Sequence, residues 1–382
     1  MSTTPDLKFM RLALRLARRG CGATSPNPMV GAVLVKAGRI IGRGWHHQAG
    51  GSHAEIEALR DAQRRGHSPR DAALYVTLEP CCTHGRTPPC TDAIIAAGIR
   101  RVIAGATDPN PKHAGKGFKI LRRAGVQVTH EILAEECARL NEAFNHWIVY
   151  CTPFVTVKAA MTLDGKIATP GGESKWITGE KARATGMNIR QASDAIMVGV
   201  NTILADDPSL TVRLGGEIQP SKLRRIVLDS LARTPLTAKV VSDEFAALTT
   251  IVATKRAPKN KVLALEKKVK VLIAPWAKSA IGNRQSTINL GWLLKKLGEA
   301  NVTSLLVEGG GEVNASFLLG GLAQRLAFFY SPKILGGRAA RKSVAGEGAK
   351  SLRDIVQLQN IEWRTLGEDL FLTALVHRGG VS

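Results

Sequence analysis

The chain has 382 residues, 44% of them hydrophobic and 22% charged. It can therefore form about two domains, each with a buried core, and is not a disordered protein. No uninterrupted apolar run reaches the roughly 20 residues that a membrane-spanning helix needs, which argues against a membrane protein. The net charge of +22 would attract polyanions. Because basic residues are spread along the chain and only 5% of residues are aromatic, phosphorylated small molecules explain this charge as well as nucleic acid does.

The first predicted element is a helix near the N-terminus. Its apolar residues recur at helical spacing, namely Leu7, Met10, Leu14 and Ala17. Gly20 stands where such a helix would stop. The stretch is also rich in arginine and poor in acids, as an organelle-targeting peptide would be, but the apolar spacing favours a packed helix. We therefore expect a cytoplasmic protein.

The rest of the first half alternates between strand-like and helix-like stretches. We expect a hairpin over 30–35 and 39–45, further strands over 74–78 and 101–104, and helices over 53–64, 91–97 and 117–124. A helical stretch over 131–147 runs toward Pro153, which breaks it. This pattern predicts a layered α/β domain that ends near Tyr150.

The second half alternates in the same way and shares no motif with the first. Buried-looking strands are expected over 154–160, 195–198, 225–228, 250–253, 269–273 and 304–307, with helices between several of them. Strand-like segments near 327–330 and 370–376 end the chain. The sequence therefore predicts a second α/β domain.

A set of candidate zinc ligands lies in the first half. Three of the six cysteines crowd into the loop after the 74–78 strand, and no secretory signal places them in an oxidising compartment, so they indicate metal binding. A catalytic zinc takes three protein ligands and leaves a fourth position for water. His53 with Cys81 and Cys90 would supply the ligands, and Glu55 would supply a carboxylate that moves protons.

These residues follow the His-x-Glu and Pro-Cys-x-x-Cys signature of zinc nucleobase deaminases, with one departure. Eight residues, instead of two, separate Cys81 from Cys90. Cys82 and His84 therefore remain alternative ligands. A closed zinc knuckle with four protein ligands and no chemistry is the other alternative, but a knuckle has no use for a glutamate beside its histidine.

Two loops and one glycine-rich turn have the features of ligand sites. Asn27, in a Pro-Asn-Pro segment, either offers a donor and an acceptor to a pyrimidine edge or forms a simple turn. Residues 108–111 follow a strand at the end where α/β folds bind ligands, and either hold a phosphate or turn the chain. In the second half, a buried strand leads into three glycines at 309–311, an arrangement in which backbone amides receive a phosphate. A plain strand-to-helix turn is the alternative there.

Taken together, these segments resemble the bifunctional riboflavin-biosynthesis deaminase/reductase family over nearly the entire chain. The motifs that carry the resemblance lie at residues 26–31, 53–55, 77–81, 84–90, 108–111, 163–165, 173–178, 204–208 and 307–310. The resemblance implies an α/β fold class, with a cytidine-deaminase-like three-layer domain over 1–147 and a dihydrofolate-reductase-like α/β domain over 153–382. It also implies two steps: hydrolytic deamination of a diaminopyrimidine phosphoribosyl compound to the uracil, then NADPH reduction of the ribosyl to the ribityl side chain.

The resemblance also implies roles for particular residues. One zinc ion per chain would be bound by His53, Cys81 and Cys90, with Glu55 as the proton shuttle. The residues implied to contact NADPH are Trp176, Thr202, Asp206, Ser230, Gly310, Gly311, Glu312, Val313, Asn314, Ala315 and Ser316. Those implied to contact substrate are Ser174, Arg190, Leu210, Arg213 and Glu308, and Lys158 and Asp206 are candidates for polar assistance to the reduction.

The resemblance further implies a small-molecule substrate, no nucleic-acid or membrane partner, and a homo-oligomer. Two rival hypotheses come from other classes of protein. A nucleic-acid-editing deaminase is favoured by the charge but leaves the second half unexplained. A zinc-stabilised binding protein would use the metal only to fold.

Overall fold

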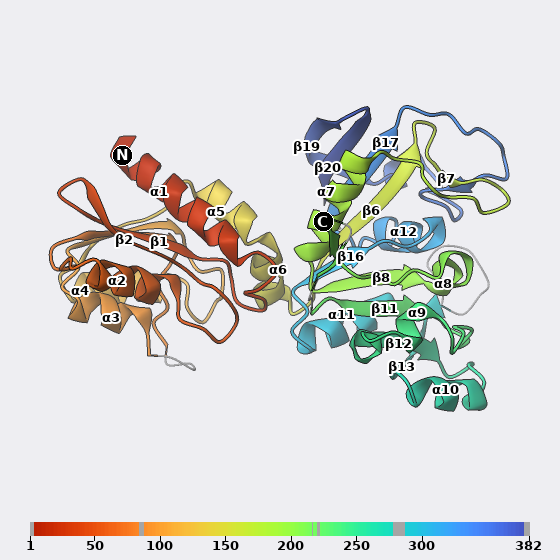
Figure 1. Ribbon diagram of the computed structural model, residues 1–382, viewed down its shortest axis with the longest axis horizontal. Coiled ribbons are helices and arrows are strands. Elements are labelled where there is room, and N and C mark those ends of the chain that lie inside the picture. Colours follow the sequence, from red (N-terminus) through yellow and green to blue (C-terminus); the bar gives the residue numbers. More distant parts are fainter. Residues whose placement is uncertain (1–3, 84–87, 216, 220–221, 278–286, 378–382) are drawn as a thin grey trace. The chain divides into compact units, whose positions relative to one another are not determined.

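In the computed structural model, which describes residues 4–83, 88–215, 217–219, 222–277 and 287–377, the chain divides into two units. The first is Met1–Cys151 and the second is Thr152–Ser382 (Figure 1). None of the described helices is both long and apolar enough to cross a membrane.

The first unit is built on a five-stranded sheet in the order β2-β1-β3-β4-β5. The strands are β1 (Gly31–Lys36), β2 (Arg39–Trp45), β3 (Ala73–Leu78), β4 (Arg101–Ala106) and β5 (Gln127–Thr129). Strand β1 runs antiparallel to β2 and β3, whereas β3, β4 and β5 are parallel. The carboxyl ends of β3 and β4 therefore meet at one edge of the sheet, where the zinc ligands are expected.

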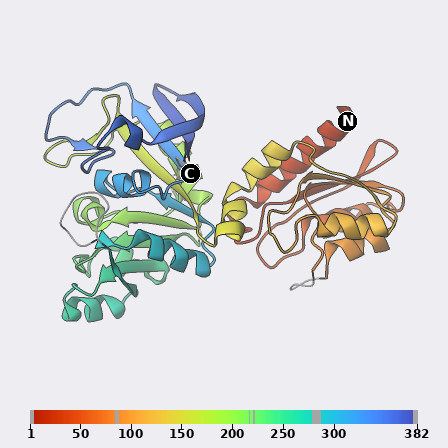
Figure 2. The same ribbon diagram turned by 180° about the vertical axis from the view of Figure 1, so that it is seen from behind.

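Helices cover both faces of this sheet because successive strand residues point to opposite faces. The helices are α1 (Thr4–Ala17), α2 (Ala54–Arg64), α3 (Cys90–Ala96), α4 (Lys116–Arg123), α5 (Ala134–Leu140) and α6 (Glu142–Tyr150), with a 3₁₀ turn over Arg18–Gly20. Ala32 and Leu34 pack with α2, α3 and α4, while Val33 and Val35 pack with α1 and α5. Figures 1 and 2 show α1 on one side of the sheet and α3 and α4 on the other. The expected three-layer domain is confirmed.

The expected continuous helix over 131–147 is wrong. It is two helices, α5 and α6, that meet at Asn141. The buried side chain of Asn141 bonds the backbone of Met29 twice, accepting from its N–H at 2.8 Å and donating to its carbonyl at 2.9 Å. The residue is held at φ −112°, outside helical geometry, so these long-range bonds interrupt the helix.

The second unit contains a nine-stranded sheet in the order β13-β12-β11-β8-β16-β6-β17-β20-β19. These strands are β6 (Phe154–Thr162), β8 (Ala195–Gly199), β11 (Arg224–Leu228), β12 (Thr249–Thr254), β13 (Lys270–Ala274), β16 (Ser304–Val307), β17 (Arg325–Ser331), β19 (Gln357–Leu366) and β20 (Asp369–His377). All pairings from β13 to β17 are parallel, and β20 and β19 add an antiparallel hairpin. The carboxyl ends of β11, β8 and β16 therefore lie side by side.

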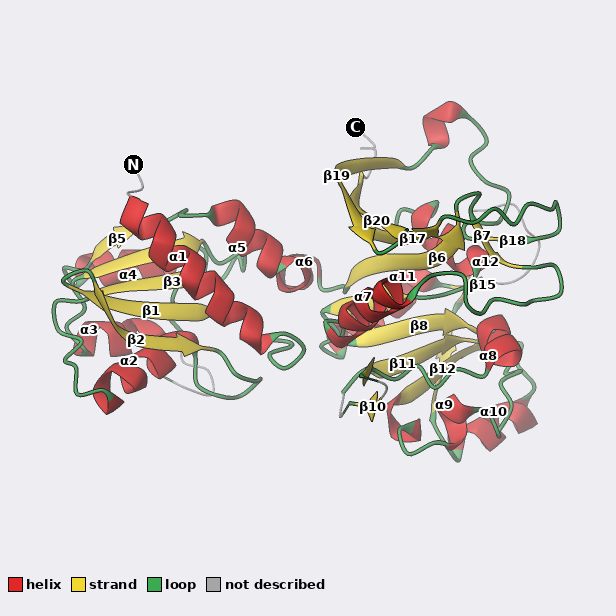
Figure 3. Ribbon diagram, turned by 45° about the horizontal axis from the view of Figure 1, so that its top comes forward, coloured by secondary structure: helices red, strands yellow, loops and turns green. Residues whose placement is uncertain are grey.

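Helices again cover both faces (Figure 3). They are α7 (Glu180–Gln191), α8 (Val200–Asp206), α9 (Lys239–Ser242), α10 (Lys259–Glu266), α11 (Leu290–Glu299) and α12 (Gly311–Leu318). Side chains of α11 and α12 pack in one core, and those of α8, α9 and α10 in the other. The short elements are β7 (Lys166–Ala168), β9 (Arg213–Leu214), β10 (Glu217–Ile218), β14 (Trp276–Ala277), β15 (Thr287–Ile288), β18 (Arg341–Lys342) and 3₁₀ turns at Ala246–Leu248 and Leu352–Asp354.

Candidate active sites

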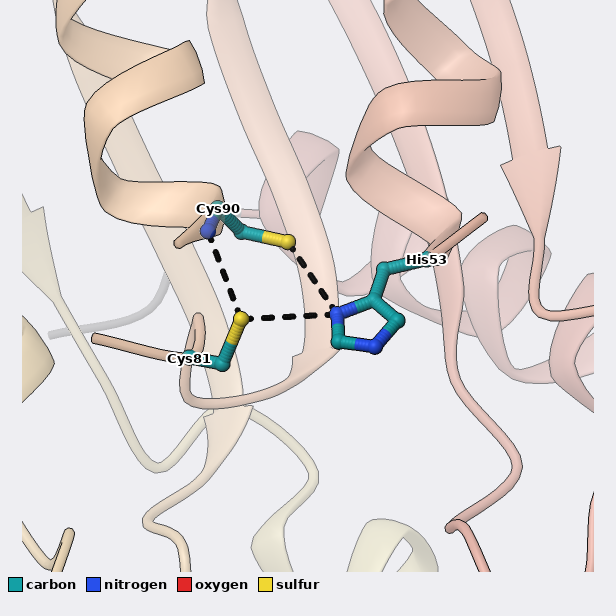
Figure 4. Close-up of side chains that lie close together, drawn as sticks. All are labelled: His53, Cys81 and Cys90. Atoms are coloured by element: carbon teal, nitrogen blue, oxygen red, sulfur yellow. Dashed lines mark hydrogen bonds between the residues drawn. The ribbon is translucent and has the colours of Figure 1, made fainter. Parts of the chain in front are cut away.

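Three candidate metal ligands converge in the first unit. His53 is the residue before α2, Cys81 lies three residues after β3, and Cys90 opens α3. His53 Nδ1 lies 3.3 Å from Cys90 Sγ and 3.4 Å from Cys81 Sγ (Figure 4). All three ligand atoms lie within 4.8 Å of one another. The structure thus brings together the three side chains that the sequence singles out.

The start of α2 is held in place by a glycine in the neighbouring strand. A Cβ built on Gly44 would lie 2.3 Å from the carbonyl oxygen of Ala54 and 2.4 Å from the amide of Ala58. Only glycine allows such a close approach of helix backbone to strand. Since Ala54 lies between His53 and Glu55, this contact fixes both functional side chains relative to the sheet.

The ligand set fits zinc. Zinc bonds of about 2.3 Å to sulfur and 2.0–2.1 Å to nitrogen, at tetrahedral angles, separate neighbouring ligand atoms by about 3.5 Å. The two sulfur–nitrogen distances match that spacing. A hydrogen bond from the Cys90 thiol lowers the pKa of Cys81, which favours the thiolate form that zinc binds. Three ligands and one open position are typical of a catalytic site.

Glu55 is buried beside this cluster, with 3% of its surface exposed. Burial raises its pKa to about 7, and the negative charge of Cys81 acts in the same direction. A carboxyl group with a pKa near the working pH both accepts and releases protons. Glu55 is not one of the three clustered ligands.

Two other residues, Cys82 and His84, are the alternative candidates for zinc ligands. Cys82 is outside the cluster, and its Sγ lies 3.9 Å from His113 Nδ1. His84 lies outside the described residues.

Asn27 is bonded to a buried histidine that the sequence analysis did not single out. Nδ1 of His46 is 2.9 Å from the carbonyl of Ser52, so this nitrogen carries the proton and Nε2 is the acceptor. Asn27 Nδ2 donates to that Nε2 at 3.2 Å. Burial lowers the pKa of His46, in keeping with a neutral ring. The amide of Asn27 is thereby oriented, with Oδ1 left as its acceptor. The available signal was the position of His46 at the end of the 39–45 strand.

Glu79 is a second residue whose role was missed. Its carboxylate accepts backbone N–H bonds from Asp108 at 3.1 Å, Gly115 at 2.9 Å and Gly117 at 2.9 Å. A Cβ on Gly117 would lie 2.4 Å from the carbonyl oxygen of Pro80. Glu79 therefore fastens the 108–117 segment against the residues that lead to Cys81. A carboxylate directly after a buried strand was the available signal.

The second unit holds a cavity of about 1020 Å³ along the carboxyl ends of β8, β11 and β16. The predicted residues that line it are Ser174, Thr202, Asp206, Ser230, Glu308, Gly310, Gly311, Glu312, Val313 and Ser316. Arg341 and Lys342 line it as well. The cavity has about the size of a small-molecule site, and its mixed lining includes charged side chains and consecutive glycines.

The other predicted residues of this site do not line the cavity. Trp176 is 68% exposed and stacks against the Arg183 guanidinium at 4.8 Å. Asn314 is buried and donates to the carbonyl of Ser343, and Ala315 is buried beside it. Leu210 packs in the core at φ 53°.

Arg213 also lies outside the cavity lining, and its guanidinium donates to Ser209 Oγ at 2.8 Å. The roles in ligand binding assigned to these residues stay predictions.

A half-buried ionic cluster lies at the edge of the cavity. Arg190 donates to both carboxylate oxygens of Glu308, at 3.0 and 2.8 Å, and Lys158 Nζ lies 3.6 Å from the same carboxylate. Burial acts to raise the pKa of Glu308, but the charges of Arg190 and Lys158 hold it at about 2. A third Arg190 nitrogen donates to the carbonyl of Thr211 at 2.9 Å, which ties α7 to the 209–213 segment. Glu308 is therefore an oriented anion at neutral pH.

The glycine turn fits a phosphate-bearing cofactor. A Cβ on Gly309 would lie 2.5 Å from Val313 Cβ, and one on Gly311 would lie 2.2 Å from the carbonyl of Lys342, so packing requires both glycines. Gly310 faces open space. Bare amides at the start of α12, beside the cations of the cavity lining, suit the diphosphate of NADPH.

Both units match known protein families. Residues 153–372 match the family described as the RibD C-terminal domain, and residues 3–106 match the cytidine and deoxycytidylate deaminase zinc-binding region. The riboflavin biosynthesis protein RibD of Actinobacillus pleuropneumoniae is 44% identical, over 98% of this chain and 96% of that protein. The Escherichia coli protein of the same name is 38% identical, over 96% of this chain and 98% of that one.

The chain belongs to the RibD family. It is therefore a bifunctional deaminase and reductase of riboflavin biosynthesis that uses zinc and NADPH. The Acinetobacter baumannii RibD structure matches with a TM-score of 0.85 at 33% identity, covering 98% of this chain and 99% of that one.

A RibD-family structure from Thermotoga maritima matches with a TM-score of 0.82 at 34% identity, with the same coverage. That protein is a diaminohydroxyphosphoribosylaminopyrimidine deaminase/5-amino-6-(5-phosphoribosylamino)uracil reductase. The expected fold class and function are confirmed, and both rival hypotheses fail because each leaves the RibD reductase domain unexplained.

Proposed function

We propose that the first unit deaminates 2,5-diamino-6-(5-phosphoribosylamino)pyrimidin-4-one and that the second unit reduces the resulting 5-amino-6-(5-phosphoribosylamino)uracil to its ribityl form. The observation that carries the proposal is the cluster of His53, Cys81 and Cys90 with the buried Glu55 beside it. A carboxylate that is not a ligand, next to a three-ligand site, is what hydrolytic deamination requires.

In the first unit, each residue has a separate task. Zinc, when bound by His53 and the two cysteines, supplies the Lewis acidity that makes water a nucleophile near neutral pH. Glu55 takes one proton from that water and gives it to the departing ammonia, so the ring carbon exchanges its amino group for oxygen. Asn27, oriented by His46, accepts a hydrogen bond from the pyrimidine edge through Oδ1.

In the second unit, the cavity orients the sugar and the cofactor. NADPH, when bound, supplies the hydride that reduces the anomeric carbon. The Glu308 carboxylate, fixed by Arg190, accepts hydrogen bonds from ribosyl hydroxyl groups. Lys158 is a second cation beside this carboxylate, with Nζ at 3.6 Å, and we assign it, with Asp206 of the cavity lining, to assist proton movement. Homo-oligomerisation and a cytoplasmic location remain part of the proposal.

Incubation with the diaminopyrimidine substrate, followed by mass analysis of the products, tests the proposal. Without NADPH we expect the uracil compound and one equivalent of ammonia. With NADPH we expect the ribityl product, two mass units heavier than the uracil compound, and matching oxidation of the cofactor. Reduction of the diaminopyrimidine in the absence of deamination would contradict the proposed order of steps.

A further inference from the structure

The β11 end of the cavity carries a rigid turn with an arginine in it. Asp229, fully buried, accepts from the backbone N–H and the hydroxyl of Thr234, each at 2.7 Å. The carbonyl of Ser230 accepts from the N–H and hydroxyl of Thr254 at 3.2 and 2.9 Å. These bonds fix both ends of the turn, so the position of Arg233 between them is set by the fold.

Arg233 lines the cavity and forms no ion pair with a described carboxylate. Its guanidinium donates at 2.9 Å to Oδ1 of Asn201, which lies in the first turn of α8 and also lines the cavity. The amide of Asn201 is neutral, and Arg233 has no carboxylate within 4 Å among the described residues. A cation that faces a nucleotide cavity without a counter-ion is suited to bind an anionic group of the ligand.

The order of the strands indicates which anionic group this is. In doubly wound α/β sheets, the diphosphate lies at a glycine turn, and a residue near the end of a further strand reads the ribose 2′ position, where arginine accommodates a 2′-phosphate. Here the glycine turn follows β16, and Arg233 follows β11. In the sheet, only β8 lies between these two strands. Two strand spacings amount to about 10 Å.

Two other basic residues line the cavity but lie elsewhere. Arg341 and Lys342 form β18, which pairs with β7 in a separate two-stranded sheet. Seen from β11, β7 lies beyond α12 (Figures 1 and 3). Their place beside the glycine turn, where the carbonyl of Lys342 approaches Gly311, suits the diphosphate and not the far ribose.

We propose that Arg233 binds the 2′-phosphate of NADPH and thereby selects NADPH over NADH. The inference rests on the proposed reductase function of the second unit and adds to it a residue that determines cofactor specificity.

Equilibrium binding to the full chain tests this role without any turnover. Calorimetry would give dissociation constants for NADP⁺ and NAD⁺, and for the fragments adenosine 2′,5′-bisphosphate and AMP. In Arg233→Gln we expect affinity for the two 2′-phosphorylated ligands to fall about 10–100-fold, the effect of losing one charge-assisted hydrogen bond, while NAD⁺ and AMP bind as before.

Arg341→Gln is the matched control, because it removes an equal charge from the same cavity. We expect it to weaken NADP⁺ and NAD⁺ by the same factor. Equal losses for both dinucleotides in Arg233→Gln, or a changed preference in Arg341→Gln alone, would overturn the assignment. If the unsubstituted chain binds neither dinucleotide, the proposed reductase function itself fails.

Discussion

At the scale of single residues, the roles proposed for the deaminase centre assign metal binding and proton transfer to different side chains. The candidate ligands His53, Cys81 and Cys90 come from three separate segments of the chain, whereas Glu55 is buried next to them without belonging to the cluster. Removal of the carboxylate should therefore affect chemistry and leave the metal in place. Metal content and turnover are two independent measurements on one variant.

Glu55→Gln should still bind one zinc but lose deamination by about 10²–10⁴-fold, because the amide keeps the size of the side chain and cannot carry the proton. Reduction of the uracil compound should continue, since that step belongs to the other unit. Metal analysis, ammonia release and NADPH oxidation check the three expectations. Loss of zinc would make Glu55 a ligand, and near-normal ammonia release would exclude it from proton transfer.

Cys82 provides the matched control for the cysteine ligands. Cys82→Ser should retain zinc and deamination, because its sulfur contacts His113 and lies outside the cluster. Cys81→Ser and Cys90→Ser should each lose the metal, since each removes one of three ligands. Zinc content after dialysis against a weak chelator decides the matter. Loss of zinc in Cys82→Ser alone would show that the ligand assignment is wrong.

At the scale of elements, Glu79 joins the end of β3 to the segment that precedes α4. Glu79→Gln would turn an amide N–H₂ toward backbone N–H groups that now have an acceptor, which should cost about 1–3 kcal/mol of unfolding free energy. Zinc affinity should also fall, because Cys81 follows two residues later.

Denaturant unfolding and competition with a chelator measure the two effects. Glu136→Gln, on the exposed face of α5, is the control and should change neither. Unaltered zinc affinity in Glu79→Gln would mean that the 108–117 segment does not position Cys81.

The elements also show how far the sequence could go. The cluster of candidate zinc ligands could be predicted because few residue types bind zinc and their motifs are short. The roles of Glu79, His46 and Arg225 could not be predicted, because these roles depend on partners that only folding brings together. Arg225 is 1% exposed, and its guanidinium bonds Asp243, Thr249 and the carbonyls of Ser209 and Val240. In the sequence it is only one of two arginines at the start of a strand.

The same limit explains the error in helix prediction. Helical periodicity over 131–147 is real, but a single buried amide at Asn141 interrupts it through bonds to Met29, more than a hundred residues away. Local propensity cannot contain that information.

At the scale of the whole molecule, the two units have separate cores and separate candidate sites. A fragment that starts at Thr152 should therefore fold and oxidise NADPH when supplied with the uracil compound. Circular dichroism and a spectrophotometric assay check this, with the full chain as the control. A folded fragment that binds NADPH and does not turn over would contradict the independence of the two sites.

The close approach at Gly44 gives the deaminase centre an unexpected dependence. The positions of His53 and Glu55 depend on a strand residue that has no side chain. A methyl carbon on Gly44 would lie only 2.3 Å from the carbonyl oxygen of Ala54. Adding that one carbon would displace the candidate metal ligand His53 and the proposed proton carrier Glu55 together, although Gly44 has no reactive group. Gly44 therefore controls the geometry of the candidate site without taking part in its chemistry.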